Sequence, residues 1–182
     1  MKQETKRRAA ACAAGFVLPR YEEIPQVGLY LDQTVKYVNG FYLPFPCVEL
    51  TPSMVSNYVK QGLIGHPVKK KYTRDQLASL LYIAAAKTVL SIENIEMLFQ
   101  VQRAHCTMAV AYEAFRCELG RCLPYVFGLS TVLEPLPADA ADERFLMRSA
   151  MLAAANKLYL DCCLTALRQE EAFWPGILPD LA

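Results

Sequence analysis

The sequence lacks the short motifs that mark the most common classes of enzyme. Its 182 residues contain no glycine-rich dinucleotide fingerprint, no P-loop, no HExxH helix and no GxSxG elbow. His105 and Cys106 lie near Cys117 and Cys122, but a structural zinc site has tighter ligand pairs, and buried thiols on helices explain them better. We therefore expect no enzyme, no catalytic residue, no cofactor and no metal.

The sequence also lacks an excess of charge of one sign, since its net charge is +1. The two halves differ, however. Residues 1–90 carry 12 basic and 6 acidic side chains, a balance of +6, whereas residues 91–182 carry 7 and 12, a balance of −5. This asymmetry predicts that the first half contacts a polyanion and that the second half has another role.

No secretory signal and no membrane span are expected. Only three alanines separate the basic residues 6–8 from Cys12, which is too short for the apolar part of a signal. The long apolar segment near the C-terminus carries charged side chains, among them Arg148 and Lys157. The seven cysteines are odd in number and several lie on apolar helical faces, which favours a reducing compartment. We expect a cytoplasmic protein that does not bind a membrane.

Apolar spacing predicts a mainly α-helical chain, since 54% of the residues are hydrophobic and they recur at helical intervals. Residues 1–17 are expected to form a loose or partly helical tail, and residues 41–50 an ordered loop. Helices are predicted over 27–39, stopped by Gly40; over 52–61, 73–87 and from 91 to 99; over 107–123, broken by Pro124; and over 140–173, ended by Trp174-Pro175-Gly176.

Residues 51–74 carry the most specific pattern. Thr51 and Pro52 are a typical N-cap and first helical residue, and Gly62 is a typical end. Residues 63–72 predict a small hairpin, here called the wing, with its turn marked by Gly65 and Pro67. Two interpretations stay open: a winged helix-turn-helix that places the 52–61 helix in the DNA major groove, or a solvated basic turn between ordinary helices.

Three segments in order resemble the MerR-type regulators. Residues 51–64 resemble the recognition helix of that family, residues 69–77 its wing exit, and residues 89–95 the start of the helix that follows. The resemblance implies a mainly α fold in which a MerR-like winged helix-turn-helix with a small β-hairpin wing, residues 18–100, precedes an α-helical assembly or effector part, residues 101–182. Residues 18–100 are also similar to an uncharacterised bacterial family known only as a domain of unknown function, which implies no activity.

The resemblance implies a transcriptional regulator that binds double-stranded DNA. The expected contacts are Thr51, Ser53, Ser56, Asn57, Tyr58, Lys60, His66, Lys69, Lys70, Lys71, Tyr72 and Arg74. Tyr58 and Tyr72 have an alternative role as core aromatics, and His66 as a solvated side chain. The main alternative is a protein-interaction module that has lost DNA binding, because Ser53 and Ser56 stand where MerR-type regulators usually carry arginine.

The helix predicted over 140–173 is apolar over a wide arc and must be covered on more than one side. We expect a homodimer with Leu152, Tyr159 and Cys163 at its interface. In the alternative, helices 107–123 and 29–39 cover this helix within one chain. The sequence leaves open the operator, the regulated pathway, and whether a small-molecule effector binds.

Overall fold

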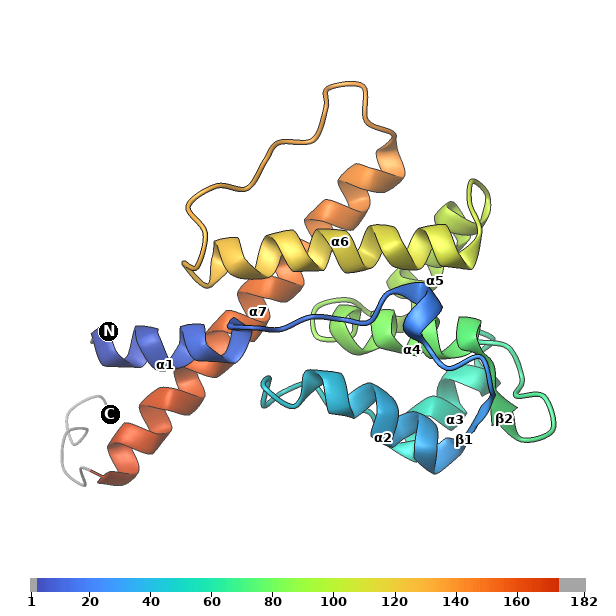
Figure 1. Cartoon of the computed structure of the whole chain (residues 1–182), viewed down its shortest axis with the longest axis horizontal. Helices are drawn as coiled ribbons and strands as arrows, with labels where there is room; N and C mark the ends of the chain where they lie inside the picture. The colour runs from blue at the N-terminus through green and yellow to red at the C-terminus, as the bar shows by residue number, and fades with distance from the viewer. Residues whose placement is uncertain (1–2, 174–182) are drawn as a thin grey trace.

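The computed structural model describes residues 3–173 of the chain, so the predicted helix end at Trp174-Pro175-Gly176 lies outside the described residues. In the described part, the fold is mainly α-helical, as the sequence predicts, with seven α-helices and one small antiparallel sheet (Figure 1). The elements in order are α1 Gln3–Ala13, a 3-10 turn Tyr21–Glu23, β1 Leu29–Tyr30, α2 Leu31–Tyr42, α3 Pro52–Lys60, β2 Lys71–Tyr72, α4 Arg74–Ala86, α5 Ile92–Arg103, α6 Met108–Val126 and α7 Asp142–Phe173.

Local capping sets several helix starts where the sequence predicts them. The hydroxyls of Thr51, Thr73 and Ser91 each accept a hydrogen bond from the backbone N–H three residues later, at the starts of α3, α4 and α5. The predicted end of α3 is confirmed as well. Gly62 adopts the left-handed φ of 76°, which any side chain would disfavour.

Two predicted helix ends are wrong. Gly40 lies inside α2, which begins at Leu31 and continues to Tyr42 because the Tyr42 side chain is buried and donates its hydroxyl to the Leu81 carbonyl at 2.7 Å. Pro124 lies inside α6. Because proline has no N–H, the backbone hydrogen bond to the carbonyl of Gly120 is missing, and Gly120 is exposed to water. Burial of Leu123 and Phe127 holds the last turn of α6 in place.

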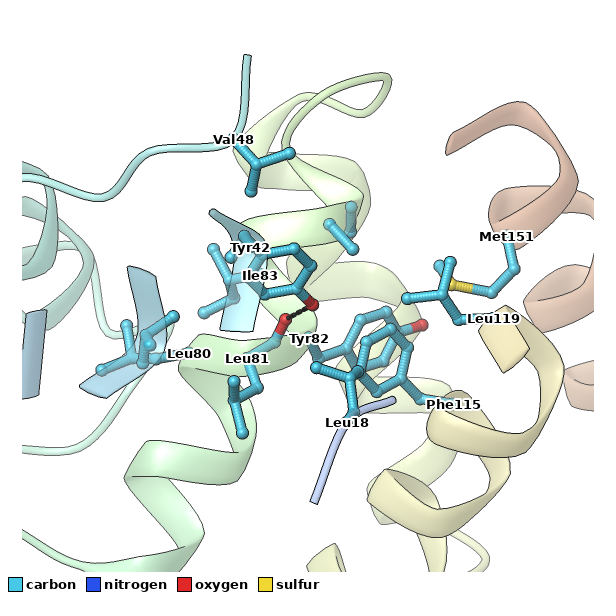
Figure 2. Close-up of a cluster of buried hydrophobic side chains, with 14 of the residues drawn as sticks. Leu18, Tyr42, Val48, Leu80, Leu81, Tyr82, Ile83, Phe115, Leu119 and Met151 are labelled. Carbon is cyan, nitrogen blue, oxygen red and sulfur yellow. Dashed lines mark hydrogen bonds between the residues drawn. The ribbon is translucent and has the colours of Figure 1, made fainter. Parts of the chain in front are cut away.

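Helix α4 is the centre of the core. Every residue from Gln76 to Ala86 is buried, which requires neighbours on all sides, and α2, α6 and α7 pack around it. Figure 2 shows the Tyr82 ring of α4 against Phe115 of α6, and these two rings stack at 4.5 Å. One hydrophobic cluster therefore extends from α1 through α4 to α7.

Helix α7 crosses α6 and packs against it (Figure 1). Helix α1 packs against α7, with Ala9 and Ala13 buried. Within residues 3–173, α7 is the one helix long and apolar enough to cross a membrane, over Asp142–Gln169, by length and composition only. Such a test also selects the core helix of a water-soluble fold. Arg148 on α7 is buried and paired with Glu118 on α6, as expected of a helix whose inner face is in a protein core.

Candidate nucleic-acid interface

The wing is tied to the segment before α2 by the small sheet. Leu29 pairs with Tyr72, and Tyr30 pairs with Lys71, in antiparallel register. A Cβ on Gly28 would lie 2.9 Å from the Lys71 Cβ, so only glycine permits this approach. The sheet thus fixes the exit of the wing beside the start of α2, a pairing that the hairpin predicted within residues 63–72 does not include.

The tight turn of the wing lies at Lys69-Lys70, not at Gly65 and Pro67 as the sequence predicts. The N–H and carbonyl groups of Val68 and Lys71 exchange hydrogen bonds of 2.9 and 3.0 Å, which closes a two-residue hairpin. The prediction was wrong because it relied on the usual turn residues. Here the turn position follows from the pairing of β2 with β1, which places Lys69 and Lys70 at the tip.

Both residues of the wing tip, Lys69-Lys70, have left-handed backbone angles, with φ of 49° and 64°. They are the only residues other than glycine with positive φ among those described. Asn-Gly is the typical pair for such a turn, and a left-handed conformation costs a side-chain-bearing residue about 1–2 kcal/mol. The fold therefore retains two strained lysines at the exposed tip of the wing, and such strain often occurs at functional positions.

Gln76, at the start of α4, holds the base of the wing. Its side-chain amide donates to the carbonyls of Gly65 and His66 at 2.6 and 3.2 Å. Its carbonyl oxygen accepts from the Thr73 N–H at 2.8 Å, which completes a capping box. The wing is thus connected to the core helix by a fully bonded, nearly buried side chain.

The outer face of α3 presents Ser53, Asn57 and Lys60, all exposed. The half-buried Ser56 donates its hydroxyl to the Pro52 carbonyl at 2.9 Å, and the Thr51 hydroxyl is engaged in capping. Residues 51–72 contain four lysines and no carboxylate side chain. This part of the surface can accept a polyanion without repulsion from its own residues.

The residues predicted to contact DNA fall into two groups in the structure: side chains that are exposed, and side chains that are engaged within the fold by burial or hydrogen bonds. His66, Lys69 and Lys70 are exposed, like the three α3 residues above. Tyr58 and Tyr72 are each 4% exposed, and burial raises the pKa of both hydroxyls. They therefore support α3 and the wing from inside.

Arg74 belongs to the engaged group. Its guanidinium donates to the carbonyls of Ile24 at 2.9 Å and Glu22 at 3.3 Å, and lies 5.5 Å from the centre of the Tyr21 ring. The hydroxyl of Tyr21 in turn donates to the neighbouring Asp75. The charge of Arg74 thus fixes the segment before β1 to the start of α4.

Sequence reasoning missed Tyr30. This side chain is 51% exposed, and the Lys71 ammonium lies 5.1 Å from the centre of its ring. The contact follows from the register of β1 and β2, which joins residues about forty positions apart and leaves no local pattern. Tyr30 adds an aromatic ring and a hydroxyl beside Lys71 at the base of the wing.

The predicted dimer residues lie on the inner side of α7. Cys163 is 5% exposed and belongs to the hydrophobic core, and Leu152 packs against that core. The Tyr159 ring contacts Phe127 at 5.2 Å. In the structure, α6 and α1 cover this side within one chain.

Comparison with known proteins adds a family but no activity. The model of a family described as a domain of unknown function, DUF1836, matches residues 19–115. The matched segment runs from residue 19, ahead of β1, through α3, the wing and α4 into α6. No curated protein and no solved structure matches the chain.

Proposed function

The chain belongs to the DUF1836 family, whose function is unknown, and from its own surface we propose that it is a DNA-binding transcriptional regulator. Helix α3 enters the major groove of double-stranded DNA, and the wing holds the adjacent phosphates. The observation that carries this proposal is the wing tip, where two lysines occupy strained backbone positions beside a helix without carboxylates. The resemblance to MerR-type regulators supports the same arrangement.

The side chains divide between the two tasks of a DNA reader. Ser53, Asn57 and Lys60 are short or flexible polar groups on one exposed helix face, and Asn can bond adenine through two hydrogen bonds. Lys69 and Lys70 carry charge without a role in the core, as phosphate contacts require. Lys71 adds a third cation towards α2, with its ammonium near the Tyr30 ring.

The direct test is binding of the full chain to duplex DNA from upstream of its own gene, at two salt concentrations. We expect affinity that falls as salt rises, because each neutralised phosphate releases counterions. Absence of binding at the lower salt concentration would refute the proposal.

The strained wing tip gives a prediction in which stability and binding change in opposite directions. Replacement of Lys69→Asn together with Lys70→Gly supplies the residues that the turn favours. We expect the free energy of unfolding to rise by about 1 kcal/mol, since relief of the left-handed strain exceeds the added entropy of the unfolded chain. DNA affinity should fall, because two phosphate contacts are lost. Thermal denaturation and the salt series measure both effects, and a variant that gains stability with undiminished affinity contradicts the DNA role of the tip.

The exposed Asn57 gives a prediction about sequence preference. Asn57→Ala should lose about 1–3 kcal/mol of discrimination at one base pair if its amide bonds a base edge. Selection of preferred sites from random DNA, with wild type and variant, measures this. Asn94→Ala, an exposed asparagine on α5, is the matched control and should leave the preference unchanged. Identical preferences for the wild type and Asn57→Ala would show that Asn57 does not contact a base.

A second candidate function, a protein-interaction module, has one observation in its favour. Helix α3 carries no arginine, and its surface includes Met54, which is 39% exposed beside the Lys87 ammonium. An exposed apolar side chain on a surface with few charges suits a protein partner as well as a DNA groove. DNA binding that is absent at low salt, together with a retained fold, would favour this function.

A further inference from the structure

Four of the seven cysteines lie in the region where α1, the loop after α2 and the second half of α7 meet. They are Cys12 on α1, Cys47 in the loop, and Cys162 and Cys163 on α7. All four are free thiols, and Cys162 interacts electrostatically with each of the other three. The proposed function uses none of them, so these thiols are available for another role.

Two contacts show how α1 and α7 are aligned. Arg8 on α1 donates its guanidinium to the side-chain carbonyl of Gln169 on α7 at 3.1 Å. Cys12 follows Arg8 by about one helical turn and Cys162 precedes Gln169 by about two, so each cysteine shares a helix face with its neighbour in this contact. The helices run in opposing directions where they cross (Figure 1). This alignment brings the two cysteines together, and the Cys162 thiol donates a hydrogen bond to the Cys12 sulfur.

The other two thiols are poorly suited to a disulfide with Cys162. A disulfide needs Cα atoms about 4.4–6.8 Å apart, whereas adjacent residues are about 3.8 Å apart. The side chains of Cys162 and Cys163 also diverge, because neighbours on a helix point in different directions. Cys47 donates its thiol to the Asp161 carboxylate, which directs it away from a sulfur partner.

Cys12, by contrast, is well placed to pair with Cys162. Its own thiol donates to the Arg8 carbonyl, one turn back on α1, at 3.8 Å, so its sulfur stays free to accept. Ala9 and Ala13, beside it on α1, are small and buried, which lets this helix pack closely on α7. The fold therefore holds these two sulfurs next to each other before any oxidation.

We propose that Cys12 and Cys162 form a redox modification site, at which a peroxide oxidises the two thiols to a disulfide that joins α1 to α7. The Cys12 sulfur attacks one oxygen of the peroxide: an S–O bond forms, the O–O bond breaks, and the leaving group takes the Cys12 proton, as water in the case of hydrogen peroxide. The Cys162 sulfur then attacks the Cys12 sulfur: the S–S bond forms, the S–O bond breaks, and water leaves with the Cys162 proton. Two electrons pass from the two sulfurs to the peroxide.

The two cysteines differ in exposure, which sets the order of these steps. Cys12 is half-buried near the end of α1, so a small oxidant reaches it from water, whereas Cys162 is 2% exposed. Burial, and after it the hydrogen bond with Cys12, raises the pKa of the Cys162 thiol well above its usual range, so Cys162 keeps its proton. A protonated thiol is a poor nucleophile towards peroxide. Cys162 is, however, already in place to attack an oxidised Cys12.

The disulfide is reversible and links distant parts of the chain. In a reducing compartment, which the sequence favours, disulfides are usually transient and respond to oxidants. A bond between Cys12 and Cys162 closes a loop of about 150 residues, and closure of a long loop restricts the unfolded chain. Oxidation should therefore fix α1 on α7 and raise the urea concentration at which the chain unfolds. The inference does not rest on the proposed function, because neither cysteine belongs to α3 or to the wing.

The test is to oxidise the reduced full chain with hydrogen peroxide, block the remaining thiols and digest the chain with trypsin without a reductant. Cys12 lies in the tryptic peptide of residues 9–20, and Cys162 in that of residues 158–168. We expect mass spectrometry to find these two peptides joined, in chains that keep the single mass of 20.4 kDa. The number of free thiols should fall from seven by two, and dithiothreitol should restore all seven.

Three variants identify the two sulfurs. Cys12→Ala and Cys162→Ala should each lose the joined peptides. Cys163→Ala should keep them, and it is the matched control because Cys163 lies in the same peptide as Cys162 and is similarly buried, at 5% exposure. Circular dichroism checks that each variant keeps its helices. The half-buried Cys12 also gives a second measurement: the rise in the urea midpoint on oxidation of the wild type should be absent from Cys12→Ala.

Three results would overturn the inference. In the first, peroxide joins no peptides in the wild type and yields only sulfinic acids. In the second, the peptide of residues 37–60, which carries Cys47, is joined in place of residues 9–20. In the third, the joined peptides persist in Cys162→Ala and disappear in Cys163→Ala.

Discussion

Removal of the three wing lysines together, as Lys69→Ala, Lys70→Ala and Lys71→Ala, is expected to weaken binding to every DNA sequence alike. Each phosphate contact contributes about 0.9 to the slope of log affinity against log salt, so the slope should flatten by about 2–3. The tip lysines are exposed, and Lys71 keeps its ammonium at the surface above Tyr30. The loss of charge should therefore leave the fold intact, and titrations at several salt concentrations measure the effect.

The matched control removes three other exposed cations, Lys6, Arg7 and Arg8 on α1. In Figure 1, α1 lies at the opposite end of the molecule from the wing. Three alanines there change the net charge by the same amount but should leave the slope close to that of the wild type. Equal losses in the two triple variants would mean that the wing has no special role and that net charge alone draws the chain to DNA.

The number of lysines and arginines in this region was visible in the sequence, but their availability was not. The sequence predicts that Arg74 binds phosphate with the wing lysines. The structure uses its guanidinium on the carbonyls of Glu22 and Ile24, about fifty residues earlier in the chain. No local pattern connects these positions, because the contact depends on how the segment before β1 packs against the start of α4.

The elements that sequence reasoning predicted well are those with a local cause. Helix α3 begins and ends where the Thr51 cap, Pro52 and Gly62 place it. Gly40 and Pro124 gave wrong ends because buried neighbours outweigh a local preference of a few kcal/mol at most. The strands β1 and β2 have two residues each, too short for any alternation to show, and their pairing depends on the missing side chain of Gly28.

The buried pair of Glu118 on α6 and Arg148 on α7 should give the largest loss of stability. Glu118 and Arg148 are 5% and 9% exposed, and Arg148 also donates to the Glu134 carbonyl at 2.8 Å, which holds the loop between the helices. Arg148→Met leaves the Glu118 carboxylate buried with one partner fewer. We expect a loss of about 3–5 kcal/mol in the free energy of unfolding, measured by urea denaturation.

Two further variants show whether the loss comes from an unpaired buried charge. Arg121 also contacts Glu118, at 2.9 Å, but its side chain is 50% exposed, so Arg121→Ala should cost less than about 1 kcal/mol. Glu118→Leu combined with Arg148→Met removes both charges and should recover most of the stability lost in Arg148→Met alone, because an apolar pair of similar volume needs no partner in the core. If the double variant is as unstable as Arg148→Met, the pair acts through the Glu134 contact and the shape of the loop. In that case the connection between α6 and α7, rather than the buried charge, sets the position of α7 against the core.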